Sequence, residues 1–315
     1  MVAARVLARH VAGLAVTAWA STIIIFGALA IAPGSPIAFL SGGRTLSPAE
    51  KAALNSYYHL HDPLWQRYWD WLKALVQGDL GTSIAFHEPV STVLLPRLET
   101  TLFLVAYAGV LIVVGGILLG VIGATSRRAV DGIVTALTTV GLATPAFVAA
   151  VGLTLVFAVH LGLFPVFGSG SGFGGRIVHL TLPAVSLAIG GVALIARITR
   201  AAMRTELASE HVETARSRGL SEARVVRRHA LRNALIPVTT ASGLTIGALL
   251  AGTTVVETAF GVSGGGSLLV QSVQDKDFPV VQAACLLLVV AFAVINSGID
   301  LLYGVIDPRI RRATT

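Results

Sequence analysis

The sequence predicts an all-α membrane protein with six transmembrane helices and a long extracytoplasmic segment after the first helix. Hydrophobic residues make up 54% of the chain and charged residues only 12%, whereas soluble globular proteins are about 25% charged. The apolar residues occur in blocks about 20 residues long, which is the length that a helix needs to cross a bilayer core of about 30 Å. The basic residues lie between these blocks rather than on one soluble face, which argues against a nucleic-acid partner.

Six apolar blocks are long enough to span a membrane. They comprise approximately residues 11–32, 100–124, 133–160, 180–198, 238–256 and 279–303. The first block follows Arg5 and Arg9, as a signal peptide would. It exceeds the 7–15 apolar residues that are typical of signal peptides, so we expect a retained helix.

The distribution of Arg and Lys predicts the orientation, because short cytoplasmic connections carry an excess of positive charge. With the N-terminus in the cytoplasm, the inside segments hold 16 basic residues and the short outside connections hold 2. Both termini of this multi-pass chain are therefore expected in the cytoplasm.

Small and ring-constrained residues inside the spans predict how the helices pack and bend. Gly116 and Gly120 are four residues apart, as are Gly243 and Gly247, and such pairs allow helices to approach closely. Pro145 is expected to mark a bend or the end of a span, and Pro183 the same.

Two carboxylates at the ends of spans are candidates for structural or transport roles, since charge inside a membrane is costly. Asp300 lies on the last span, where pairing with Arg197 or Arg200 is the favoured interpretation and a transport role the alternative. Glu257 lies at the external end of the fifth span, where we expect an anchor at the membrane surface or else part of a gate.

The first external segment, residues 33–97, is too long for a plain connection. One helix is expected from Pro48 with Ser47 as its N-cap, and a second after Pro63. In the second helix Trp65 and Trp69 share a face with Leu72. This composition suits a membrane–water interface. A small packed external cap without a ligand contact is the favoured interpretation, and contact with an external partner is the alternative.

The cytoplasmic segment between the fourth and fifth spans predicts a helix, a glycine turn and a second helix. Ser209 is a suitable N-cap for the first helix and Ser221 for the second. Gly219 followed by Leu220 fits a Schellman ending. A structured, strongly basic connection of this length, residues 199–236, is expected to dock a cytoplasmic partner.

The last external connection contains three consecutive glycines within residues 260–267. A phosphate-binding loop would need a strand before the glycines and a helix after them, in a soluble fold. That context is missing, so a pliable loop or re-entrant turn is expected here.

The sequence lacks the motifs of self-sufficient catalysis. None of the three lysines follows a glycine as in a P-loop, so ATP is not expected to bind this chain in that way. His59 and His61 form a poor metal pair, and Cys285 is the single cysteine. We therefore expect a non-catalytic subunit without a metal or cofactor of its own.

The segment Glu213-Thr214-Ala215, with Gly219 four residues after the alanine, resembles the EAA loop of bacterial ABC-importer permeases. The run from Arg228 to Pro237 resembles the dipeptide and oligopeptide branch of that family. Further matching motifs, in the same order as in the family, begin at Gly78, Arg197, Glu257, Asp277 and Asp307. The long segment after the first span resembles that of the B-type subunit. Arg232 replaces a proline of the general EAA pattern, and Ser263 stands where proline is frequent.

The resemblance implies a type I ABC importer permease in the bacterial plasma (inner) membrane, with residues 1–99 forming the first helix and the external segment, and residues 100–315 forming a five-helix core. It implies a second permease subunit, two ATP-binding subunits that hold ATP and Mg²⁺, and an extracytoplasmic substrate-binding protein. Coupling to the ATPase is expected from Glu213, Ala215, Gly219, Leu220 and Ser221. Contact with the binding protein is expected from Val262, Ser263, Gly264, Gly265 and Gly266.

The cargo implied by the resemblance is a dipeptide or oligopeptide. Glutathione, a nickel complex or a sugar would fit the same mechanism. A stand-alone secondary carrier is the alternative from another class, although its expected buried charges and broken half-helices are scarce in this sequence.

Overall fold

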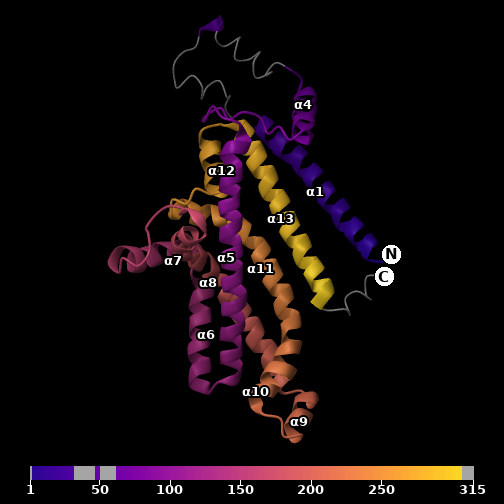
Figure 1. Ribbon diagram of the computed structural model, residues 1–315, viewed down its shortest axis with the longest axis vertical. Coiled ribbons are helices and arrows are strands. Elements are labelled where there is room, and N and C mark those ends of the chain that lie inside the picture. Colours follow the sequence, from indigo (N-terminus) through magenta and orange to yellow (C-terminus); the bar gives the residue numbers. More distant parts are fainter. Residues whose placement is uncertain (1, 32–46, 50–61, 307–315) are drawn as a thin grey trace. The chain divides into compact units, whose positions relative to one another are not determined.

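A computed structural model describes residues 2–31, 47–49 and 62–306 of the chain, and the side chains from residue 11 to residue 298 within these ranges (Figure 1). The described residues form two compact units. Unit 1 comprises Met1–Thr101 and Ser263–Val294, and unit 2 comprises Leu102–Val262 and Ile295–Thr315.

Helices account for nearly all regular structure in the described ranges. In chain order they are α1 (Val2–Ile31), α4 (Leu64–Val76), α5 (Val90–Thr125), α6 (Arg128–Ala143), α7 (Ala146–Leu153), the π-helical segment η1 (Thr154–His160), α8 (Gly172–Leu207), α9 (Glu210–Ser217), α10 (Glu222–Arg224), the π-helical segment η2 (Val225–Ala230), α11 (Leu231–Ala259), α12 (Gly265–Gln274) and α13 (Phe278–Ile306). The helix predicted from Pro48 is described only at its first two residues, and the remainder of it, like the motif at Asp307, lies outside the described residues.

Five of the six predicted spans are long helices that are apolar enough to cross a membrane. They lie in α1, α5, α8, the continuous stretch from α10 to α11, and α13. These five predictions are confirmed by helix length and composition.

The remaining predicted span, residues 133–160, consists of two helices rather than one straight helix. The chain breaks between α6 and α7, whose axes differ by 107°. Pro145 is the N-cap of α7, and Thr144 before it is extended, with ψ at 115°. Proline disfavours the helical conformation of the preceding residue and cannot donate a helical hydrogen bond. The bend expected at Pro145 is therefore confirmed.

In unit 2, α8 is the central helix and packs against α6, α7 and α11. Gly116 and Gly120 of α5 face α8, and a methyl group on either glycine would approach this helix too closely. A Cβ on Gly116 would lie 2.6 Å from Cβ of Ile195, and one on Gly120 would lie 2.7 Å from the carbonyl oxygen of Ala196. The predicted packing role of this glycine pair is confirmed, and Gly247 of α11 similarly approaches Asn296.

The arginines of α8 form polar contacts with α6 of unit 2. Asp131 of α6 accepts hydrogen bonds from Arg200 at 2.5 Å and from Arg204 at 2.8 Å. Arg197 donates to the Thr139 hydroxyl at 2.7 Å. The side chain of Asp300, the partner predicted for these arginines, is not among the described ones.

The expectation that Glu257 anchors the fifth span at the membrane surface is wrong, because its side chain is completely buried.

Unit 1 is organised around a small apolar core and a buried carboxylate. The core residues come from α5, α12 and α13: Val90, Leu94, Leu268, Val280, Ala283 and Ala284. The Asp277 carboxylate accepts hydrogen bonds from the Ser83 hydroxyl at 2.5 Å and from the amides of Ile84 and Ala85, both at 3.1 Å. Two motifs that are 194 residues apart in the sequence therefore meet at one carboxylate.

Candidate functional site: the α9 segment

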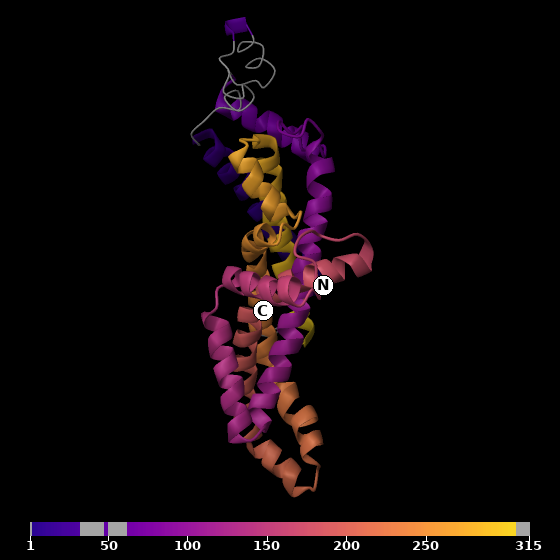
Figure 2. The ribbon, with the colours of Figure 1, turned by 90° about the vertical axis from the view of Figure 1, so that its left-hand side faces the viewer.

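The segment from the end of α8 to the start of α11 forms a helical hairpin at one end of unit 2. Figures 1 and 2 show α9 and α10 at the same end of this unit as the turn between α5 and α6. Both sides of the hairpin are continuous with long apolar helices, because α8 precedes it and α11 follows it.

The turn after α9 has the Schellman geometry that the sequence predicts. The Gly219 amide donates to the Arg216 carbonyl at 2.9 Å, and the Leu220 amide donates to the Ala215 carbonyl at 3.3 Å. Gly219 adopts φ +74°, a left-handed conformation that glycine tolerates without a steric penalty. The prediction for Gly219 and Leu220 is confirmed.

An apolar cluster fixes α9 onto the returning chain. Val212, Ala215 and Val225 are buried in it, and Leu220 packs against them. Ala215 and Leu220, two of the predicted coupling residues, therefore contribute to the packing that holds the hairpin together.

An ion pair spans the glycine turn from one helix to the next. Arg216 Nε donates to Glu222 Oε1 at 2.7 Å, and its Nη2 donates to Oε2 at 3.4 Å. Arg216 also reaches back to the Leu207 carbonyl at 3.3 Å. The hydrogen bond with Glu222 raises the pKa of Arg216 above its ordinary value.

A polar network ties α9 to the two long helices. Glu206 at the end of α8 accepts a hydrogen bond from Asn233 of α11 at 3.1 Å and lies 3.5 Å from His211 of α9. Ser209 occupies the predicted N-cap position, but its hydroxyl donates to the Glu206 carbonyl and contacts His211 instead of capping the helix. Polar contacts therefore connect α9 to both α8 and α11, and a displacement of α9 would move these two helices.

The outward side of the hairpin is polar. Glu213 and Ser221 are exposed, and Ser221 occupies the N-cap position of α10 without a capping hydrogen bond from its side chain. Of the five predicted coupling residues, the structure thus presents Glu213, Gly219 and Ser221 at the surface.

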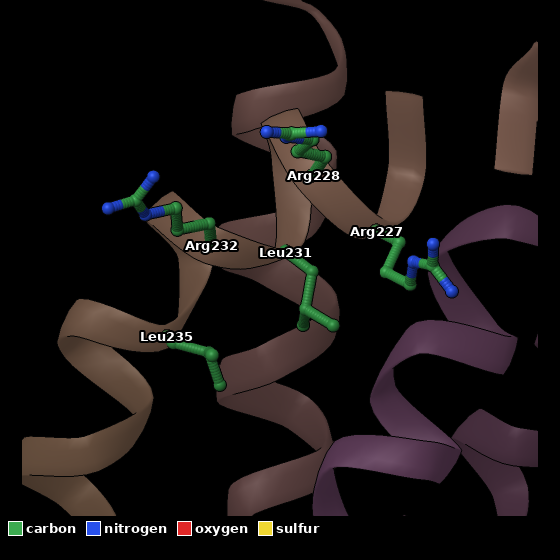
Figure 3. Close-up of a pocket in the computed structure, with 5 residues that line it drawn as sticks. All are labelled: Arg227, Arg228, Leu231, Arg232 and Leu235. Carbon is green, nitrogen blue, oxygen red and sulfur yellow. The ribbon is translucent and has the colours of Figure 1, made fainter. Parts of the chain in front are cut away.

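A shallow basic pocket of about 470 Å³ lies beside this hairpin. It is lined by Arg227 and Arg228 of η2 and by Leu231, Arg232 and Leu235 of α11 (Figure 3). Figure 3 shows the three guanidinium groups spread around the leucines rather than converging on one point. The surface next to α9 is therefore positively charged.

The glycine-rich segment at residues 262–266 is more ordered than predicted. Gly264 is the N-cap of α12, and its amide and carbonyl both hydrogen-bond the Ser267 hydroxyl, at 3.1 Å and 2.9 Å. Gly265 begins that helix, and its amide donates to the Thr101 hydroxyl at 2.8 Å. Gly264–Gly266 and Val262 are buried, whereas Ser263 is exposed. Of the two expectations, a pliable loop or a re-entrant turn, the pliable loop does not hold at Gly264–Gly266, because Gly264 caps α12 and Gly265 and Gly266 begin it.

Comparison with known proteins decides the family. Residues 116–312 match the family described as the binding-protein-dependent transport system inner membrane component, and this stretch is more than half of the chain. The chain belongs to this family of permeases. It is 34% identical to the dipeptide transport system permease protein DppB of Escherichia coli strain K12, over 92% of this permease and 94% of DppB.

Other relatives of this permease carry related names. It is 36% identical to the di/tripeptide transport system permease protein DppB of Pseudomonas aeruginosa strain UCBPP-PA14, over 97% of this chain and 98% of that protein. It is also 36% identical to the glutathione transport system permease protein GsiC of Shigella flexneri serotype 5b, over 96% of this chain and 97% of that protein. The predicted resemblance to the dipeptide and oligopeptide permeases is confirmed.

A solved structure shows the same fold. The permease superimposes on a chain of the inward-facing MetNI methionine ABC transporter with a TM-score of 0.56, over 68% of this chain and 95% of that one, at 21% identity. The predicted ABC-importer permease fold is confirmed.

Sequence reasoning did not find the contacts that brace the hairpin. Arg216 and Glu222 are six residues apart across a turn, and no helical spacing rule connects such a pair. Glu206 and Asn233 are 27 residues apart, so only the folded hairpin brings them together. The single signal in the sequence was the Gly219 turn, which implies that the residues on its two sides approach each other.

Proposed function

We propose that this permease forms the translocation pathway for dipeptides or oligopeptides together with a second permease subunit, driven by two ATP-binding subunits and supplied by an extracytoplasmic binding protein. ATP and Mg²⁺ would be held by the ATP-binding subunits, and this chain would be non-catalytic. The names of its relatives support the cargo. The excess of arginine around α9 supports a cytoplasmic position for that helix and for both termini.

The contacts that hold the hairpin together are the main support for a role in coupling. In the proposed mechanism α9 docks on an ATP-binding subunit through its polar side, where Glu213 is exposed. The Schellman turn and the Arg216–Glu222 pair hold α9 in a fixed direction. The contacts of Glu206 with His211 and Asn233 then transmit a displacement of α9 to α8 and α11. Arg227, Arg228 and Arg232 add a positive surface suited to an acidic region of the same partner.

Purification of the tagged permease from its native membrane, solubilised gently, tests the proposal. We expect a second permease and an ATPase to co-purify. Glu213→Lys should release the ATPase while the second permease stays bound, because it reverses a charge on the exposed side of α9. Ser217→Ala is the matched control, since Ser217 is also exposed on α9. Isolation of the chain alone, with solute transport in ATP-free liposomes, would instead support a stand-alone carrier.

Glutathione is a second candidate cargo, because GsiC relatives match at 36% identity, close to the identity with the peptide permeases. Uptake by the complete transporter in proteoliposomes distinguishes the two. We expect a dipeptide or tripeptide to be imported and an excess of glutathione to compete weakly. Stronger uptake of glutathione than of any peptide with free termini would assign the permease to glutathione.

A further inference from the structure

The short helix α4 carries two apolar faces side by side, and among the described residues only one of them packs against another helix. The face that contains Tyr68 and Trp71 lies against α1. The Tyr68 hydroxyl is 3.0 Å from that of Thr22, and the Phe26 ring lies 5.5 Å from Tyr68 and 6.0 Å from Trp71. All these residues belong to unit 1.

The second apolar face of α4 is exposed. Trp65 is 67% exposed, Trp69 52% and Val76 81%, and their spacing of four and then seven residues places them on one side of the helix. The polar side chains of Gln66, Asp70 and Lys73 occupy the remaining arc. Such a helix has the amphipathic pattern of one that lies in a membrane surface.

The contacts with α1 set the depth of α4. The apolar span of α1 is Val11–Ile31, and only 6% of its most apolar 18-residue window is buried among the described residues, so α1 exposes an apolar surface suited to lipid. Phe26 and Thr22 lie about 7.5 Å and 13.5 Å before the Ile31 end of that span, at 1.5 Å per residue. The α1 contacts of α4 therefore lie in the half of the span next to Ile31.

We infer that α4 is an interfacial helix whose Trp65–Trp69 face rests in the membrane lipid of the leaflet at the Ile31 end of α1. Tryptophan rings favour this layer because they combine an apolar body with a polar N–H group. The polar arc then faces the headgroups and water, and the Tyr68–Trp71 face closes on α1. This inference depends on insertion of α1 in the membrane and is independent of the cargo and of the ATP-driven mechanism.

Site-specific photocrosslinking in the complete transporter, in native membranes, tests the inference. Trp65→p-benzoylphenylalanine and Trp69→p-benzoylphenylalanine keep an aromatic side chain on the exposed face. On illumination we expect phospholipid adducts of α4, identified by mass spectrometry. Gln66→p-benzoylphenylalanine is the matched control, because Gln66 is exposed on the polar arc of the same helix.

The lipid adducts at positions 65 and 69 should exceed those at position 66 several-fold. Equal yields at all three positions would overturn the inference, because the face would then have no preference for lipid. Cross-links from positions 65 and 69 to another protein would also overturn it, and would assign this face of α4 to a partner subunit.

Discussion

At the scale of single residues, Gly219 sets the direction of α9. Its φ of +74° is costly for other residues, whereas a Cβ on it would meet no atom within 4 Å, so strain rather than space limits substitution. The strain is about 1–2 kcal/mol, which lowers the population of the native turn roughly 5- to 30-fold. We expect Gly219→Val to reduce uptake per ATP hydrolysed in proteoliposomes by a similar factor, with membrane insertion unchanged.

Gly219→Asn is the control for this prediction, because asparagine tolerates the left-handed conformation better than β-branched residues do. It should retain most of the coupling. Unchanged coupling in Gly219→Val would show that the geometry of this turn is not used to transmit motion.

Asp277 is the second single residue on which local stability depends. Its buried carboxylate satisfies one hydroxyl and two amides, and each buried donor left without an acceptor costs about 1–3 kcal/mol. We expect Asp277→Ala to lower the melting temperature in detergent and to expose the chain around Ser83 to limited proteolysis. Asp275→Asn, two residues away, serves as the control. Equal stability of Asp277→Ala and the wild type would mean that other groups satisfy the donors.

At the scale of helices, α5 and α8 can approach closely because Gly116 and Gly120 of α5 have no side chain at the contact. Overpacking a close contact costs about 1–3 kcal/mol, so we expect Gly120→Leu to lower the thermal midpoint in detergent. Gly132→Leu is the matched control, since Gly132 is an exposed helical glycine whose added Cβ would meet no atom within 4 Å. A similar loss in both variants would point to helix propensity or detergent effects instead of packing.

The helices and turns show how much of the fold can be predicted from the sequence. Apolar length identified α1, α5, α8, α11 and α13, because a bilayer imposes one length on every span. Apolar length does not show the break between α6 and α7, because apolar composition continues through the change of direction, and only Pro145 predicted a bend there. Glycine chemistry predicted the turn at Gly219. Glycine content alone was misleading at Gly264–Gly266, because a glycine can start a helix as well as loosen a loop. The hydrogen bond from the Gly265 amide to the Thr101 hydroxyl joins residues that are far apart in the sequence, so the local pattern does not predict it.

At the scale of the whole molecule, the number of crossings decides whether the two termini share a side. In the described part of the chain, five helices are long enough to span a membrane, and the bent pair α6–α7 supplies a sixth crossing if the two together form one span. The arginines at the start of α6 and those around α9 favour the same side for both. The connection after η1 must then lie on the opposite side, which requires six crossings.

Single cysteines test this arrangement, because Cys285 is the chain's one native thiol and Cys285→Ala removes it. Gln77→Cys after α4, Ser171→Cys before α8 and Ser217→Cys on α9 each add one thiol at an exposed position. We expect a membrane-impermeant maleimide to label positions 77 and 171 from outside the inner membrane, and position 217 only after permeabilisation. Labelling of positions 77 and 217 from outside, with position 171 labelled only after permeabilisation, would show that α6 and α7 form a re-entrant pair, and would leave five crossings with the termini on opposite sides.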